Sequence, residues 1–176
     1  MKKAIALILA VLTVGALSSC DESAKPKEYR NDEIGLYYEL PSDFIEYPYV
    51  SGNVDVAYSP SDSSAMVFIS YFTNSELMRI DELEGDLSLE NYIEYNFLKI
   101  GVESGINLNV KYNSKKTRAT FDIATAQSES EEKQYSYNLI LKGEGGIYVI
   151  QMLCLESQID NYSKRFSEWG AKIYCY

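Results

Sequence analysis

Ile147–Leu155, with the sequence IYVIQMLCL, contains a single residue outside the hydrophobic set, Gln151. A second stretch, residues 65–72 (AMVFISYF), is almost as apolar. Successive side chains of a strand point to opposite faces, so a run that is apolar throughout predicts a strand covered on both sides. We therefore expect both stretches at the centre of one sheet, with a layer of structure packed on each face.

The neighbouring stretches alternate apolar and polar residues, which is typical of strands with one buried face. They are residues 36–40, 54–58, 106–112, 119–123 and 135–141. Short connections, including a Gly-rich turn at residues 143–146, join the last four strands of the chain. These connections predict an antiparallel meander.

Two amphipathic helices are expected to flank this sheet. Ser88 is placed as the N-cap of the first, which should end at Gly101 or Gly105. Its apolar stripe consists of Leu89, Ile93, Phe97 and Ile100. The stripe of the closing helix consists of Ile159, Tyr162, Phe166, Trp169 and Ile173. We interpret both stripes as core packing, and the whole as an α/β (α+β) domain on an antiparallel sheet of about six to seven strands flanked by helices.

Three features of this domain resemble the PsbP-like fold family. They are the opening GLYYELPSDF at residues 35–44, the helix near Ser88, and the closing helix with Tyr162, Phe166 and Trp169. That family includes extrinsic lumenal proteins of photosystem II, Ran-binding proteins and small bacterial lipoproteins. The resemblance implies an α/β/α sandwich over residues 32–176 and a binding or assembly role. The family shares no catalytic motif, so no site residue is carried over.

The first twenty residues have the features of an export signal. Lys2 and Lys3 precede an uncharged apolar run from Ala4 to Leu17, which is too short for a membrane-spanning helix of about 20 residues. The run ends in Leu17-Ser18-Ser19-Cys20, which resembles the lipobox of bacterial lipoproteins. The resemblance implies a lipid on the thiol of Cys20 and cleavage just before it.

We therefore expect residues 1–19 to be a signal peptide, residues 20–31 a lipidated Cys with a flexible tether, and residues 32–176 a single domain. Lipid on Cys20 would hold the protein on the extracytoplasmic side of the membrane of a bacterial cell envelope. The alternative is an ordinary signal peptide followed by a Cys with no such role.

Charge and composition exclude several classes of function. The chain has 176 residues, no His and a formal net charge of −10 at pH 7. Loss of a signal that carries Lys2 and Lys3 would make this −12. Such a surface repels nucleic-acid phosphates and anionic lipid headgroups, which excludes both as direct ligands of the domain. The missing His removes the commonest general base and zinc ligand.

The sequence contains no catalytic or cofactor motif that we can identify. It has no Gly-rich phosphate loop, no Cys-pair metal spacing and no Gly-x-Ser-x-Gly elbow. The acidic run at residues 81–86 does not have EF-hand spacing, so we interpret it as a solvated loop rather than a calcium site. We predict a protein that is not an enzyme and that carries neither metal nor cofactor.

Two thiols remain besides Cys20. Cys154 and Cys175 could form a disulfide outside the cytoplasm. However, the helix predicted between them is about 22 Å long, whereas a disulfide requires Cα atoms within about 7 Å. We therefore expect two thiols that are not joined to each other, with Cys154 buried.

One group of aromatic residues is the best candidate for a partner or ligand surface: Phe44, Tyr47, Tyr49 and Tyr58. Aromatic faces in an irregular segment can form a protein contact or stack on sugars, although packing over a sheet edge would also explain them. The leading hypothesis is an envelope lipoprotein that binds another protein or a cell-surface component without catalysis. The alternatives are a glycan or small-molecule binding module using these rings and, third, a hydrolase with paired carboxylates.

Overall fold

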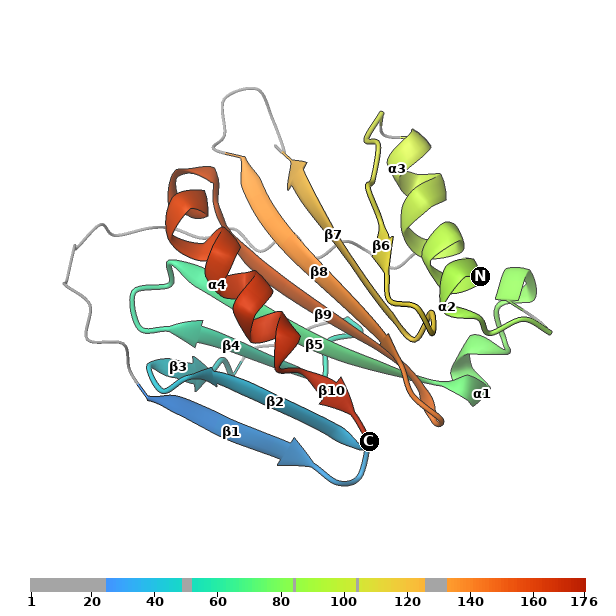
Figure 1. Cartoon of the computed structure of the whole chain (residues 1–176), viewed down its shortest axis with the longest axis horizontal. Helices are drawn as coiled ribbons and strands as arrows, with labels where there is room; N and C mark the ends of the chain where they lie inside the picture. The colour runs from blue at the N-terminus through green and yellow to red at the C-terminus, as the bar shows by residue number, and fades with distance from the viewer. Residues whose placement is uncertain (1–24, 49–51, 84, 104, 126–132) are drawn as a thin grey trace.

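A seven-stranded antiparallel sheet is the centre of the computed structural model, which describes residues 25–48, 52–83, 85–103, 105–125 and 133–176 (Figure 1). Its strands are, in spatial order, β3 (Phe44–Glu46), β4 (Val56–Pro60), β5 (Ala65–Thr73), β9 (Gly146–Leu155), β8 (Gln134–Lys142), β7 (Arg118–Thr125) and β6 (Lys111–Tyr112). The two continuously apolar stretches form β5 and β9, which pair along nine residues at the centre of the sheet, as predicted. The predicted meander and the α+β class are also confirmed.

A second, three-stranded sheet lies beside the first, with the order β1 (Pro26–Asn31), β2 (Leu36–Pro41) and β10 (Tyr174–Cys175). The predicted strand at residues 36–40 therefore belongs to this small sheet. The boundary expected at residue 32 is also wrong, because residues 26–31 pair with β2 in place of forming tether. Only Tyr29 of β1 is even partly buried, so this strand has no apolar periodicity that the sequence could reveal.

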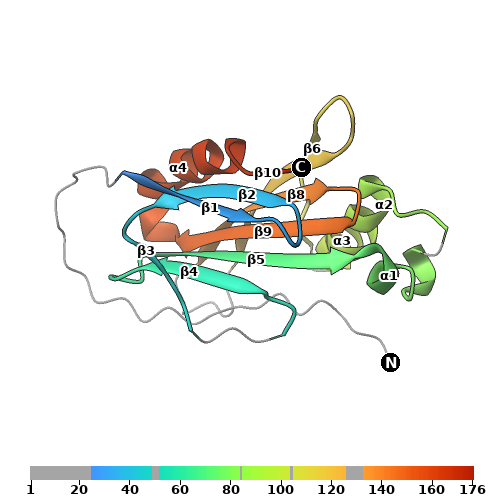
Figure 2. The same ribbon diagram turned by 90° about the horizontal axis from the view of Figure 1, so that it is seen from below.

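Other elements pack on each face of the seven-stranded sheet, as the apolar strands require. Helix α4 (Ile159–Ala171) and the small sheet pack on one face, where they bury Leu36, Tyr38 and Phe166 against β8 and β9 (Figure 2). Short helices cover part of the other face. They are α1 (Asn74–Leu77), the 3-10 turn η1 (Asp81–Leu83), α2 (Leu89–Ile93), the π-helical turn η2 (Glu94–Leu98) and α3 (Lys99–Glu103).

The helical segment after Ser88 follows the prediction in most respects. The Ser88 side chain accepts a hydrogen bond from the backbone N–H of Asn91, which confirms the N-cap. Leu89, Ile93 and Phe97 are all buried, as the stripe requires. Gly105 follows the end of α3 with a φ of +71°, a conformation that glycine adopts without steric cost.

The predicted strand at residues 106–112 is only partly formed. Just Lys111 and Tyr112 pair with β7, although exposed and half-buried residues alternate from Ile106 onwards. Leu108, Val110 and Tyr112 pack against the helix-side core. Alternation thus shows that residues 106–112 have one buried face. A strand also needs hydrogen bonds to a neighbour, and β7 pairs with this segment only at Lys111 and Tyr112.

Candidate binding surface

The outer face of the small sheet carries three partly exposed tyrosines, Tyr37, Tyr174 and Tyr176, which we call the tyrosine row. The Tyr37 and Tyr174 rings stack with centroids 4.8 Å apart and an interplanar angle of 25°. The Tyr176 ring meets Tyr174 edge-on at 6.5 Å. Tyr174 is 51% exposed and Tyr176 is 55% exposed. Large exposed rings held on strands are typical of contact surfaces.

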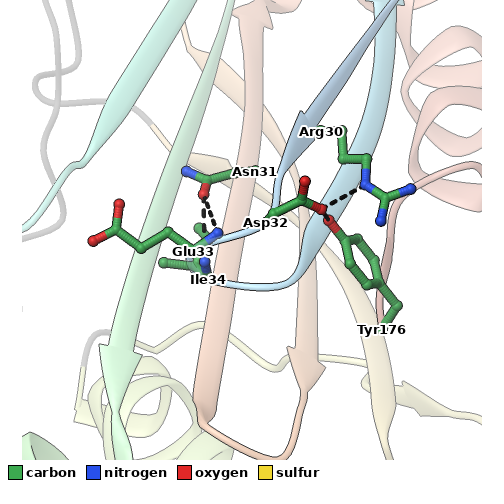
Figure 3. A network of polar contacts seen from close by, with 6 residues as sticks. All are labelled: Arg30, Asn31, Asp32, Glu33, Ile34 and Tyr176. Atoms are coloured by element: carbon green, nitrogen blue, oxygen red, sulfur yellow. Dashed lines mark hydrogen bonds and ion pairs between the residues drawn. The ribbon is translucent and has the colours of Figure 1, made fainter.

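An ion pair at the end of β1 fixes Tyr176 in position (Figure 3). Arg30 Nε lies 2.6 Å from Asp32 Oδ1, and the Tyr176 hydroxyl donates to the same oxygen at 2.5 Å. The guanidinium of Arg30 stands over the Tyr176 ring, 4.7 Å from its centre. The hydrogen bonds from Tyr176 and Arg30 lower the pKa of Asp32. The carboxylate therefore stays ionised and keeps both partners in place.

The turn between β1 and β2 supports this network. Asn31 Oδ1 accepts from the backbone N–H groups of Glu33 and Ile34, at 3.1 Å and 3.3 Å (Figure 3). Gly35 follows with a φ of +67°, and its carbonyl accepts the backbone N–H of Tyr176 at 3.0 Å. A Cβ on Gly35 would press on the Tyr176 carbonyl oxygen. Glycine is therefore needed for both the turn and the close approach of Tyr176.

A second ion pair flanks Tyr37. Lys172 Nζ, just after α4, lies 2.6 Å from Glu39 Oε2, and the Tyr37 hydroxyl donates to Glu39 Oε1 at 2.8 Å. These contacts with Lys172 and Tyr37 lower the pKa of Glu39. The bond to Glu39 in turn raises the pKa of Tyr37 to about 12. The tyrosine row is thus held at both ends by carboxylates that are themselves paired with basic groups.

The structure does not gather the four aromatic residues proposed from the sequence. Phe44 is 3% exposed and packs edge-on against Trp169, and Tyr58 is 4% exposed, with its hydroxyl 2.8 Å from that of Tyr38. Tyr47 is 42% exposed, and Tyr49 lies outside the described residues. The prediction of a four-ring surface is wrong for Phe44 and Tyr58, because both rings fill the core between the sheets. The glycan or small-molecule alternative therefore loses two of its four rings.

The tyrosine row was missed because β10 is only two residues long. The signal was present all the same. Ile173 and Cys175 alternate with Tyr174 and Tyr176, and the first pair point inward while the tyrosines point outward. Period-two alternation directly after a helix would have predicted a short strand with an aromatic outer face.

The thiols are arranged as expected. Cys154 is buried, Cys175 is half-buried, and they are not joined in a disulfide. Burial raises the pKa of the Cys175 thiol, and the Lys142 carbonyl lies 3.7 Å from its sulfur. A raised pKa opposes thiolate formation and hence nucleophilic chemistry.

Four described carboxyl groups have a lowered pKa because they accept hydrogen bonds: Asp32, Glu39, Asp86 and Glu90. A general acid at neutral pH requires the opposite shift. In the described part of the chain, no three His, Cys, Asp or Glu residues gather as a metal site. No helix among those same residues is long and apolar enough to cross a membrane.

The comparisons with known proteins identify the fold. No family model matches the chain, and no curated protein matches its sequence. The solution structure of cyanobacterial PsbP from Synechocystis matches with a TM-score of 0.59 and 15% identity, over 92% of this chain and 100% of that one. The Ran-binding protein Mog1p of Saccharomyces cerevisiae matches with a TM-score of 0.56 and 11% identity, over 87% and 96%.

A Bacteroides thetaiotaomicron protein also matches, with a TM-score of 0.50 and 15% identity. This match covers 85% of the present chain but only 48% of the other, so there the similarity is confined to part of a longer chain. The chain therefore has the PsbP-like fold, as the resemblance in its sequence implied. At these identities the likeness defines the fold alone.

Proposed function

We propose that this protein is a lipid-anchored, non-enzymatic binding protein of the bacterial cell envelope, and that the tyrosine row docks a protein partner. The observation that carries the proposal is the exposed, preorganised set of Tyr37, Tyr174 and Tyr176 beside Arg30. Tyrosine and arginine are over-represented among residues that dominate binding energy at protein interfaces.

The way in which the rings are held supports this role. Stacking and hydrogen bonds to Asp32 and Glu39 restrict the tyrosine side chains before any partner arrives. Binding would therefore lose less side-chain entropy than it would with freely rotating groups. The lowered pKa of Asp32 and of Glu39 keeps both carboxylates ionised as acceptors for the tyrosine hydroxyls and makes these two groups unsuited as general acids.

The anchor is proposed from the sequence Leu17-Ser18-Ser19-Cys20 with its charged and apolar segments upstream. A diacylglycerol on Cys20 supplies two acyl chains, which is enough for stable membrane attachment. One fold neighbour, Mog1p, is described as Ran-binding, so this fold has served for protein binding in at least that case. The low identity carries neither its partner nor its residues over to this chain.

Crosslinking in intact cells tests the binding role. We expect the wild-type chain to capture a defined partner that the double variant Tyr174→Ala/Tyr176→Ala fails to capture. Val102→Ala is the control, because Val102 is 77% exposed and lies in α3, outside the row. Equal capture by all three chains, after circular dichroism has shown that each is folded, would contradict the proposal. Labelling with a clickable fatty acid, lost in Cys20→Ala, tests the anchor separately.

A further inference from the structure

The start of β1 and strand β3 lie at the same end of the domain. Pro26 pairs with Pro41 at the end of β2, and β3 begins only three residues later, at Phe44. Both views show the beginning of β1, the end of β2 and β3 together, with α3 on the far side (Figures 1 and 2). The chain therefore enters the domain beside β3.

The connection to Cys20 is short. Since β1 begins at Pro26, only residues 21–25 separate the proposed lipidated Cys20 from the sheet. Six steps along an extended chain span at most about 20 Å. A tether that continued to residue 31 would instead reach at most about 38 Å. A domain held this closely has to bring its β3 end near the lipid surface.

That end also exposes apolar side chains. Ile45 is 61% exposed, and Tyr47, two residues further on, is 42% exposed. The backbone N–H of Tyr47 donates to the Ala57 carbonyl at 2.8 Å, which continues the strand ladder. Ile45 and Tyr47 therefore project from the same side of the strand, since side chains alternate along it. A tyrosine beside an aliphatic residue suits the boundary between lipid headgroups and acyl chains.

We infer that the β3 end of the domain rests on the membrane surface, with Ile45 and Tyr47 in contact with lipid. The inference rests on the proposed lipid anchor. Arg30 lies four residues beyond Pro26, so the network with Tyr176 is about 13 Å further along β1. The tyrosine row accordingly lies toward the end of β1 that is further from the bilayer, where partners in the surrounding envelope can reach it.

The short connection between Cys20 and β1 makes a lipid surface the binding partner that we expect at the β3 end. A second copy is disfavoured because the mature chain carries a formal charge of −12. Asp43 lies two residues before Ile45 and Glu46 directly follows it, so the contact depends on apolar atoms and gains nothing from anionic headgroups. Membrane contact at Ile45 is thus a consequence of the tether length, and a longer tether should weaken it.

Thiol accessibility in membranes tests this orientation with the full chain. Ile45→Cys and, as a control, Val102→Cys are introduced with Cys175→Ser, which removes the half-buried thiol while Cys154 stays buried. Val102 is 77% exposed and lies in α3, away from β3. A membrane-impermeant maleimide should label Ile45→Cys several-fold more slowly in membranes than in detergent. Val102→Cys should be labelled at the same rate in both.

Insertion of a Gly/Ser segment of about ten residues between Ser23 and Ala24 completes the test, because it frees the domain to move away from the bilayer. Protection of Ile45→Cys should then disappear. Without the insertion, an Ile45→Cys labelling rate that is the same in membranes as in detergent would overturn the inference. Protection that survives the insertion would overturn its dependence on the tether length. Absence of a fatty-acid label on Cys20 in the same membranes would instead defeat the proposed anchor, so the two failures are distinguishable.

Discussion

The two faces of the three-stranded sheet use the same residue type in opposite ways. Tyr38 is 6% exposed and points inward, where its hydroxyl meets that of Tyr58 and its ring stacks on Tyr29 at 5.0 Å. Tyr37, its neighbour in sequence, points outward, where its hydroxyl meets Glu39. The inner tyrosines fill volume in a core, whereas the outer ones form a surface. One step along a strand therefore separates a residue needed for stability from one available for binding.

The largest expected loss of stability follows from a substitution on the inner face of the three-stranded sheet. Tyr38→Ala removes a buried ring between the two sheets and leaves a cavity, so we expect a loss of about 3–5 kcal/mol in the free energy of unfolding. Tyr37→Ala is the matched control on the adjacent residue and should cost less than about 1 kcal/mol. Urea unfolding followed by circular dichroism measures both. Similar losses for the two variants would contradict the division between core and surface.

The second largest effect is expected from a substitution that removes the contact between β7 and the segment where α4 ends and β10 begins. Arg118 reaches from β7 and donates to the carbonyls of Gly170 and Ile173, at 2.5 Å and 2.9 Å, where α4 ends and β10 begins. Arg118→Met leaves both partly buried carbonyls without this donor, so we expect a cost of about 1.5–3 kcal/mol.

The control for Arg118→Met is Lys164→Met, which removes only the exposed pair with Glu168. That change should stay within about 0.5 kcal/mol of wild type. Thermal unfolding compares the two variants. A melting temperature for Arg118→Met no lower than that of Lys164→Met would show that Arg118 does not hold the end of α4.

Hydrophobic periodicity predicts which residues of a strand are buried, and this sets how much of the architecture could be predicted from the sequence. The apolar runs in β5 and β9 predicted central strands, and alternation in β2 correctly predicted that Leu36, Tyr38 and Leu40 share a buried face. Alternation identifies a face but not the neighbouring strand, so it could not assign β2 to the small sheet. Strand β1 was invisible because Tyr29 is its only partly buried residue.

The candidate site was harder to predict for a related reason. Phe44 and Tyr58 lie in or beside short strands where aromatic residues suit either a core or a surface, and only the packing of Trp169 and Tyr38 decides between the two. Tyr174 and Tyr176 become a surface only because Arg118 and Gly35 bring the end of the chain against β2. The alternation from Ile173 to Tyr176 predicts a short strand, but no local pattern shows which strand it pairs with.

The third effect appears only at alkaline pH. Burial raises the pKa of both Tyr38 and Tyr58 above the ordinary tyrosine value near 10. Below pH 10 these tyrosines are neutral in both the folded and the unfolded chain, so their contribution to stability is fully present. Above pH 10 the unfolded chain ionises first, and the free energy of unfolding falls as the pH rises.

Tyrosinate absorbance and circular dichroism, recorded during one alkaline titration, measure this linkage. The buried tyrosines should ionise together with the loss of folded structure. Tyr37, whose pKa is raised to about 12 by its bond to Glu39, is held by a hydrogen bond at the surface and not by the core. Ionisation of every tyrosine before any change in circular dichroism would contradict burial of Tyr38 and Tyr58.

The smallest effect on stability is expected from a substitution on the outer face, at Glu39. Glu39→Gln removes the charge that pairs with Lys172, whose side chain is 50% exposed, so we expect a cost of only about 0.2–1 kcal/mol. The same change should lower the pKa of Tyr37, because the hydrogen bond from the Tyr37 hydroxyl to the Glu39 carboxylate is the main cause of the raised pKa. A difference titration of Glu39→Gln against Glu39→Gln/Tyr37→Phe isolates that one tyrosine. A Tyr37 pKa that stayed near 12 without the carboxylate would contradict the bond to Glu39 as the main cause of the raised pKa. A downward shift with little loss of stability would mean that Glu39 mainly positions the surface and adds little to the fold.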